Sequence, residues 1–281
     1  MGYDINGIEV LPSVKERFKR EIEVFYKRDD ITGAFYTQLV IPQKNKYGDK
    51  QYPFVYWHNY PNGGVKSAFE VNQAMDFEVI INAGRYSAPY GAGVTLTGLP
   101  KGTVIQNGAV LQQGASGNYN PSLDMVLTIN SDGKIGYADP LDSASDLVSN
   151  GVVSAVTGFV PILSGYENIE DVIENTPEWI SYVDGEGDTQ HQVFGQYDNG
   201  DYAIITTEGR TYQGGSFFTV KQVQTLCKNL GIKDAFMLDG GGSTETVVGK
   251  RQLNPFYDNT LGRVNPTFII FNGSTEFSTT G

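Results

Sequence analysis

Short apolar runs separated by turn residues dominate the chain after Gly33. Runs of roughly four to eight residues that are rich in Val, Ile, Tyr and Phe and bounded by Gly, Asn or Asp are typical of β-strands. Asn107-Gly108, Asp132-Gly133 and Asp198-Asn199-Gly200 join neighbouring runs and predict tight hairpins. The predicted strand segments are 34–41, 52–58, 77–81, 104–111, 125–129, 135–137, 193–194, 202–207, 235–238, 246–248 and 266–271.

Three capping boxes mark predicted helix starts, at Ser13–Glu16, Ser67–Glu70 and Thr219–Gln222. The first precedes apolar residues at roughly helical spacing (Val14, Phe18, Ile22 and Phe25/Tyr26), which predicts an N-terminal amphipathic helix rich in Lys and Arg. The second helix is expected to end near residue 75 and the third at residue 231. A short acidic helix is expected from residue 169 until Pro177 ends it.

These elements predict an α+β fold. We expect a helical extension over residues 1–32, followed by a single strand-rich, mixed-sheet domain with a few short helices over residues 33–281. The extension either docks on the domain or serves as an oligomerisation or attachment arm. In the second case the chain forms a homo-oligomer through this helix.

Composition narrows the possible functions. The 281 residues include 20 Lys and Arg against 32 Asp and Glu, so the net charge is −12, which argues against a nucleic-acid partner. Cys227 is the only cysteine and excludes an intrachain disulfide or a cysteine-based zinc cluster. We expect no membrane segment, because no run approaches about 18 apolar residues. No signal peptide is visible, so a cytoplasmic location is expected, or a virion or extracellular one if a phage encodes the chain.

The strongest chemical signal is the segment Leu238-Asp239-Gly240-Gly241-Gly242-Ser243-Thr244. Asp239 supplies a carboxylate at the end of an apolar strand. The three glycines let the backbone approach a ligand closely and direct N–H groups toward it, which suits an anionic or hydroxyl-rich substrate. Hard oxygen ligands such as Asp239 could hold a divalent ion, but no spacing resembles a known metal loop. We therefore predict no metal and no cofactor.

Three further blocks accompany this segment in order along the chain: Ile81-Asn82-Ala83-Gly84-Arg85-Tyr86, Glu208-Gly209-Arg210 and Leu261-Gly262-Arg263-Val264-Asn265-Pro266. The series resembles the phosphodiester glycosidase family, whose members read I-N-G-G-F-F, D-G-R, L-D-G-G-G-S-S/T and R-P-V-x-N. The resemblance spans residues 77–272. It implies that the substrate is bound by Asn82, Arg210, Gly240, Gly241, Ser243, Thr244 and Arg263.

The sequence departs from the family pattern at several positions. Ala83 and Arg85-Tyr86 replace a glycine and an aromatic pair, and Glu208 stands where the family has Asp. His191 stands where the family has an Arg.

The expected chemistry assigns a role to each candidate. Breaking a sugar-1-phosphodiester at the anomeric carbon passes through an oxocarbenium-like state and releases phosphate, which is a fair leaving group. Asp239 is the candidate base or nucleophile, and Arg210 and Arg263 suit the departing phosphate. His191 could act as a general acid or hydrogen-bond donor, or simply pack in the core. Glu208 and Glu245 are the candidates for a second carboxylate.

The sequence leaves three functions open. The first is a hydrolase that cleaves a glycosyl-1-phosphodiester, for example of a cell-wall or surface glycan, to free sugar and a phosphomonoester. The second is a non-catalytic glycan-binding or virion host-attachment protein, and the third is a phosphoesterase that cleaves the P–O bond. Each has a carbohydrate or sugar phosphate as its partner.

Overall fold

The computed structural model describes residues 2–3, 9–10, 22–44, 50–86, 98–114, 124–169, 190–209, 218–254 and 265–271. The strands are β1 (Gly2–Tyr3), β2 (Glu9–Val10), β3 (Glu23–Arg28), β4 (Phe35–Ile41), β5 (Phe54–Trp57), β6 (Val79–Asn82), β7 (Val104–Gln106), β8 (Ala109–Gln112), β9 (Val126–Asn130), β10 (Ile135–Ala138), β11 (Val152–Thr157), β12 (Pro161–Ser164), β13 (Glu167–Asn168), β14 (Gln192–Gln196), β15 (Tyr202–Thr207), β16 (Asp234–Met237), β17 (Thr246–Val248), β18 (Arg251–Gln252) and β19 (Thr267–Phe271). The helices are α2 (Ala68–Met75), α3 (Ala144–Ser149) and α6 (Val220–Asn229), and η1 (Gly241–Ser243) is a 3-10 turn.

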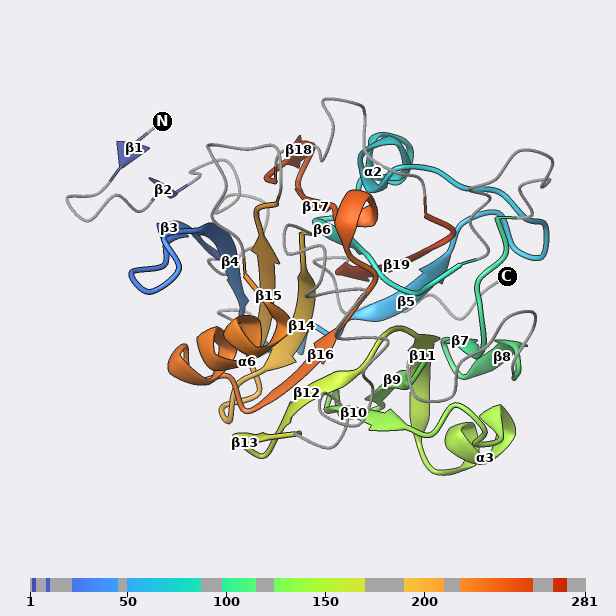
Figure 1. Ribbon diagram of the computed structural model, residues 1–281. Helices are drawn as coiled ribbons and strands as arrows, with labels where there is room; N and C mark the ends of the chain where they lie inside the picture. Colours follow the sequence, from blue (N-terminus) through green and yellow to red (C-terminus); the bar gives the residue numbers. More distant parts are fainter. Residues whose placement is uncertain are drawn as a thin grey trace, which may run out of the picture.

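Three sheets form the body of the described structure (Figure 1). The largest has the strand order β13-β12-β16-β14-β15-β4-β3. The second has the order β18-β17-β6-β19-β5 and the third β10-β9-β11-β7-β8, while β1 and β2 pair separately. The strand-rich α+β class with short helices is confirmed. The expected mixed sheet is wrong for the described strands, because every pairing among them is antiparallel.

The main core lies where the three sheets meet. Leu39 and Phe194 from the largest sheet pack with Ile81 of the second sheet and with Leu127 and Val156 of the third. Each outer face is covered by one helix: α6 on the largest sheet, α2 on the second and α3 on the third. Because strands from distant parts of the sequence share this core, the loops between sheets are anchored at both ends.

Local sequence signals predicted many of these elements correctly. Ser67 accepts a hydrogen bond from the Glu70 N–H, and the Glu70 carboxylate accepts one from the Ser67 N–H, which closes the expected capping box of α2. Thr219 and Gln222 cap α6 in the same way. The hairpins β7–β8, β9–β10 and β14–β15 also form where their turn residues predict them. The first capping box and the helix expected after residue 169 lie outside the described residues.

The predicted N-terminal helix is wrong over Glu23–Arg28, which form strand β3 at the edge of the largest sheet. All of its residues pair with β4, from Arg28 opposite Phe35 to Glu23 opposite Val40. Phe25 and Tyr26 are aromatic residues that suit a pleated strand, and Tyr26 stacks on Phe35 with ring centroids 5.3 Å apart. Pairing with β4 therefore outweighs the helical spacing of the apolar residues. Residues 11–21, which carry the rest of that prediction, lie outside the described ranges.

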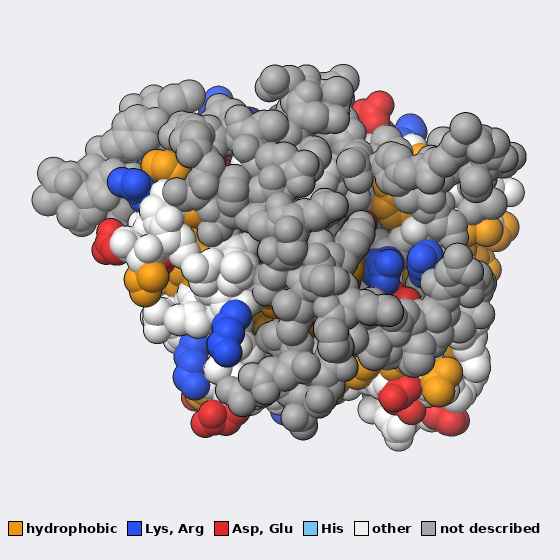
Figure 2. Space-filling model, in the orientation of Figure 1, with side chains coloured by type: hydrophobic (Ala, Val, Ile, Leu, Met, Phe, Trp, Pro, Cys, Tyr) orange, Lys and Arg blue, Asp and Glu red, His pale blue; other side chains and the backbone are white. Residues whose placement is uncertain are grey.

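The described part of the surface in Figure 2 carries basic and acidic side chains interspersed with one another, without a broad basic patch on this face. Within the described ranges, no helix has the length and hydropathy that crossing a membrane requires.

Candidate functional site

The glycine segment crosses from β16 in the largest sheet to β17 in the second sheet (Figure 1). A side chain at Gly240 would force the backbone to shift, because an added Cβ would lie 2.7 Å from the backbone oxygen of Gln190. Gly241 has a φ of 60°, in the left-handed region that favours glycine. Residues 239–245 are called the glycine turn below. Within this turn, positions 240 and 241 favour glycine for local steric reasons.

Most of the N–H groups of this turn are bonded within the protein. The Gly241 N–H donates to the Gln190 carbonyl at 2.8 Å. The Ser243 and Thr244 N–H groups donate to the carbonyls of Gly240 and Gly241. The expectation that several N–H groups of the turn point at a ligand is thus wrong for these three, because they close the 3-10 turn and attach it to Gln190, two residues before β14.

Asn82 holds both ends of the glycine turn. Its side-chain amide donates to the Asp239 carbonyl at 2.6 Å, and its side-chain oxygen accepts from the Glu245 N–H at 2.9 Å. The Asp239 N–H in turn donates to the Ala83 carbonyl at 3.1 Å. Asn82 is completely buried, so these contacts make it a positioning residue for the turn. Its direct contact with a substrate stays a prediction.

Ser243 and Thr244 lie at the buried side of the turn. The Ser243 carbonyl accepts from the Asn265 side-chain amide at 3.1 Å. This bond brings the block that begins at Leu261 to the turn, although Arg263 itself lies outside the described residues. The buried Thr244 hydroxyl makes no hydrogen bond within the described residues. The substrate-binding roles of both hydroxyls stay predictions.

His191, Glu208 and Asp239 lie at the same end of three neighbouring inner strands of the largest sheet. Asp239 closely follows β16, His191 precedes β14 and Glu208 follows β15. Since β14 lies between the other two strands and is antiparallel to both, the three residues share the same end of the sheet. The fold thus brings together three candidates that are far apart in the sequence, and their catalytic roles stay predictions. Arg210, two residues beyond Glu208, is outside the described residues.

His191 and Glu208 are both buried. His191 Nε2 lies 2.7 Å from the Phe218 carbonyl oxygen, and since a carbonyl can only accept, this nitrogen carries the proton. The Tyr26 hydroxyl donates to Glu208 Oε1 at 2.5 Å. Burial raises the pKa of Glu208, and the bond from Tyr26 opposes that rise. These contacts fix both side chains at this end of the sheet, and their catalytic roles stay predictions.

Glu245 has a structural partner at the other end of the turn. Its Oε2 accepts from the Ala68 N–H at 2.5 Å, at the start of α2. Burial raises the pKa of Glu245 to about 8, with the Ala68 N–H opposing the rise and Glu70 adding to it. Glu245 is therefore a buried support of helix α2, and a role for it as a second carboxylate stays a prediction.

Asp239 lies near a cluster of charges that sequence reasoning missed. It is partly exposed, and its charge reaches Lys101, where it acts together with Asp124 to raise the Lys101 pKa. Burial and the Arg85 guanidinium have the larger effect and lower that pKa. Arg85 Nη1 lies 2.5 Å from the buried Asp124 Oδ1, and its guanidinium lies over the Phe159 ring.

Only one residue of this cluster is marked by a pattern in the sequence. Arg85 lies in the Ile81–Tyr86 block, at a position where the family has an aromatic residue. Lys101 and Asp124 belong to no motif, and only the fold brings them near Asp239. Among the described residues, no group of three or more His, Cys, Asp or Glu side chains is arranged to hold a metal ion.

A partly exposed aspartate within electrostatic reach of a lysine suits hydrolysis at a bond with an anionic leaving group. Comparison with known proteins identifies the family. The model of the phosphodiester glycosidase family matches residues 75–271, and the chain belongs to this family.

Solved structures support the same fold. The catalytic domain of zebrafish N-acetylglucosamine-1-phosphodiester alpha-N-acetylglucosaminidase, auto-inhibited by its pro-peptide, aligns with a TM-score of 0.66 and 17% identity over 90% of this chain and 82% of that one. A hypothetical protein from Synechocystis aligns with a TM-score of 0.60 and 12% identity, over 89% of this chain and 62% of that one.

A curated relative has a phage origin. The SPbeta prophage-derived uncharacterized protein YomE of Bacillus subtilis (strain 168) is 30% identical over 102 residues, which is 36% of this chain. The match covers only 16% of that relative's length.

Proposed function

We propose that this protein hydrolyses a glycosyl-1-phosphodiester to a free sugar and a phosphomonoester. Family membership and the fold suggest a glycosidase-type hydrolase. The observation that carries the finer proposal is the position of Asp239, a partly exposed carboxylate whose residue is fixed by its backbone bonds and whose charge reaches Lys101.

In the reaction, the bond between the anomeric carbon and the bridging oxygen breaks, and its electron pair leaves with the phosphate. Water supplies the new oxygen on the anomeric carbon. Asp239 takes the proton from that water, or first attacks the carbon itself and is then released by water. Both routes consume one water and yield the same two products.

Lys101 is our candidate for stabilising the leaving phosphate among the described residues. The Arg85 guanidinium is engaged with Asp124 and with the ring of Phe159. That ion pair fixes one side of the cluster, while partly exposed Lys101 lies next to it. Arg210 and Arg263 stay predicted partners of the phosphate, since their guanidinium forks match phosphate oxygens.

The experiment is incubation of the purified protein with the methyl phosphodiester of N-acetylglucosamine 1-phosphate, the sugar named in its zebrafish structural relative. We expect equal amounts of N-acetylglucosamine and methyl phosphate. Release of methanol with sugar 1-phosphate would instead indicate a phosphoesterase. Diesters of glucose, galactose and mannose 1-phosphate in the same assay would define the sugar.

A second candidate function is glycan binding without turnover, in a virion or another host-attachment protein. The similarity to a prophage-derived protein favours this context. It predicts saturable glycan binding and no product from any of the diesters. An attachment protein can also be an enzyme, so turnover would not exclude a phage context.

A further inference from the structure

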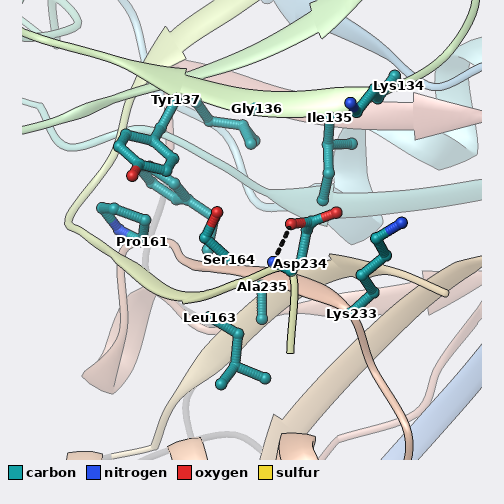
Figure 3. A pocket seen from close by; sticks show the side chains of 13 residues that line it. Lys134, Ile135, Gly136, Tyr137, Pro161, Leu163, Ser164, Lys233, Asp234 and Ala235 are labelled. Carbon is teal, nitrogen blue, oxygen red and sulfur yellow. Dashed lines mark hydrogen bonds between the residues drawn. The ribbon is translucent and has the colours of Figure 1, made fainter. Parts of the chain in front are cut away.

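A cavity of about 400 Å³ lies between the edge strand β10 of the third sheet and strands β12 and β16 of the largest sheet (Figure 3). It borders the start of β16, whereas Asp239 follows its end. Asp239 lies five positions after Asp234, which corresponds to about 16 Å of extended chain. The cavity is thus separate from the candidate catalytic site.

The floor and rim of this cavity differ in chemistry. Buried apolar side chains, including Leu163 and Phe236, form its floor. At the rim, Tyr137 is 46% exposed, and Ser164 is exposed as well. Figure 3 shows Tyr137 and Ser164 on one side of the cavity and Asp234 on the other. An apolar base with a few convergent polar groups, in a cavity of this size, is typical of a small-molecule site.

The carboxylate of Asp234 is held in place at this rim. Its Oδ1 accepts from the Gly165 N–H at 2.9 Å, the bond drawn in Figure 3. The pair of carboxylate oxygens has about four acceptor positions, so this one bond leaves acceptor capacity for hydroxyl groups of a ligand. Asp234 is therefore a fixed acceptor opposite an exposed aromatic ring.

The charges around the cavity balance. Lys233 Nζ lies 2.6 Å from Asp198 Oδ1, so this lysine is paired with a carboxylate beyond the cavity lining. Lys134 and Asp234 then contribute one charge of each sign to the lining. With no net charge, the cavity does not select an anionic ligand such as a phosphate.

We propose that this cavity is a second, non-catalytic binding site for a neutral saccharide. A sugar ring has an apolar face that packs on an aromatic side chain, and its hydroxyls pair with carboxylate, hydroxyl and ammonium groups. Tyr137 offers the aromatic surface, while Asp234, Ser164 and Lys134 offer the polar partners. The site goes beyond the proposed hydrolysis and does not require it.

The test begins with an array of neutral, sialylated and phosphorylated glycans, using the Asp239→Asn variant so that no bound glycan is cleaved. The neutral glycan with the strongest signal is then titrated against further variants in that background. We expect Tyr137→Ala to weaken binding at least about tenfold, because the stacking surface is lost. Tyr137→Phe keeps the ring and should retain most of the affinity. Asp234→Asn, which keeps the acceptor for Gly165, should weaken binding severalfold.

Leu141→Ala is the matched control, since Leu141 is 75% exposed, follows β10 and does not line the cavity. It should bind the neutral glycan as the unaltered chain does. The proposal is overturned if no neutral glycan binds, if only charged glycans bind, or if Tyr137→Ala binds as well as Leu141→Ala. The last outcome would place the glycan elsewhere, such as near the glycine turn.

Discussion

The two ends of the glycine turn carry carboxylates with opposite surroundings. Asp239 is partly exposed and lies near Lys101, whereas Glu245 is fully buried and accepts from the first N–H of helix α2. Asn82 bonds to the backbone of both residues and keeps the two ends in register. The two carboxylates of one short segment therefore have different roles in our account: Asp239 at the exposed end is the proposed reactive group, and Glu245 at the buried end anchors the segment to the fold.

Removing the charge at the open end should have the largest effect. Asp239→Asn keeps the shape of the side chain and the backbone bonds of the residue, so the fold should persist. We expect kcat to fall on the order of 10³-fold or more, because the base or nucleophile is lost. Sugar release measures kcat, and thermal unfolding shows whether the fold persists. A variant with near-normal kcat would remove Asp239 from the reaction.

The second-largest effect is expected from removing Asn82, which links the two ends of the glycine turn. Asn82→Ala removes the partners of the Asp239 carbonyl and the Glu245 N–H, so we expect a loss of about 2–4 kcal/mol in the free energy of unfolding. Activity should also fall, because Asp239 loses its support. Denaturant unfolding measures the stability.

The matched control for Asn82→Ala is Asn199→Ala. Asn199 is exposed, and its side chain bonds only locally with Asp201 in the β14–β15 turn. A similar loss of stability in both variants would contradict the role given to Asn82.

A backbone substitution tests the steric basis of the turn. Gly240→Ala places a methyl group against the Gln190 carbonyl, so we expect a loss of roughly 1–3 kcal/mol in stability. Gly136→Ala is a useful control, since Gly136, like Gly240, is outside the left-handed region, and its added Cβ would meet only the Thr128 side-chain oxygen, at 3.2 Å. The control should lose less stability than Gly240→Ala. If Gly240→Ala causes no loss in stability or activity, the turn does not need its close contact with the Gln190 backbone.

Lys101→Met tests the cation near Asp239. We expect kcat/KM for the methyl phosphodiester to fall about 10²-fold, since one charge near the leaving phosphate is removed. Lys101→Arg keeps the positive charge and should retain part of the kcat/KM that Lys101→Met loses. Lys221→Met, on the exposed side of α6, is the control and should leave kcat/KM unchanged. Equal activity of the two methionine variants would exclude a role for Lys101.

The smallest effect is expected from Glu245, at the buried end of the glycine turn, and it concerns the pH dependence of stability. Because the pKa of Glu245 is raised from an ordinary 4.5 to about 8 in the folded protein, the folded state holds a proton that the unfolded chain loses at lower pH. Stability from this group is fully present below about pH 4.5 and is lost as the pH rises toward 8.

Glu245→Gln keeps an acceptor for Ala68 and cannot ionise. We therefore expect its melting temperature to fall less between pH 5 and pH 8 than that of the unaltered chain, by a few degrees. Parallel pH profiles for the two proteins would show that Glu245 does not titrate with folding.

Local chemistry explains which elements were predictable. The capping residues Ser67 and Thr219 and the turn at Asn199-Gly200 act within a few positions of themselves, so their effects are visible in the sequence. Strand β3 was not predictable, since its stability comes from pairing with β4. A helical spacing of apolar residues alone could not reveal that partner.

The residues of the candidate site also differ in how far the sequence alone could reveal them. The glycine turn and Asp239 were found because they form a continuous motif. The role of Asn82 depends on partners 157 and 163 positions away. Lys101 joins Asp239 only through the packing of the sheets. Contacts of this kind are set by the tertiary fold and leave no local pattern.

The most direct test of the central claim is hydrolysis of the methyl phosphodiester of N-acetylglucosamine 1-phosphate in ¹⁸O-labelled water. The account predicts that the label enters the sugar and that methyl phosphate remains unlabelled, because the anomeric C–O bond breaks. The anomeric oxygen must be analysed early, before it exchanges with solvent. Label in the phosphate, with an unlabelled sugar product, would contradict the account and assign the protein to P–O cleavage.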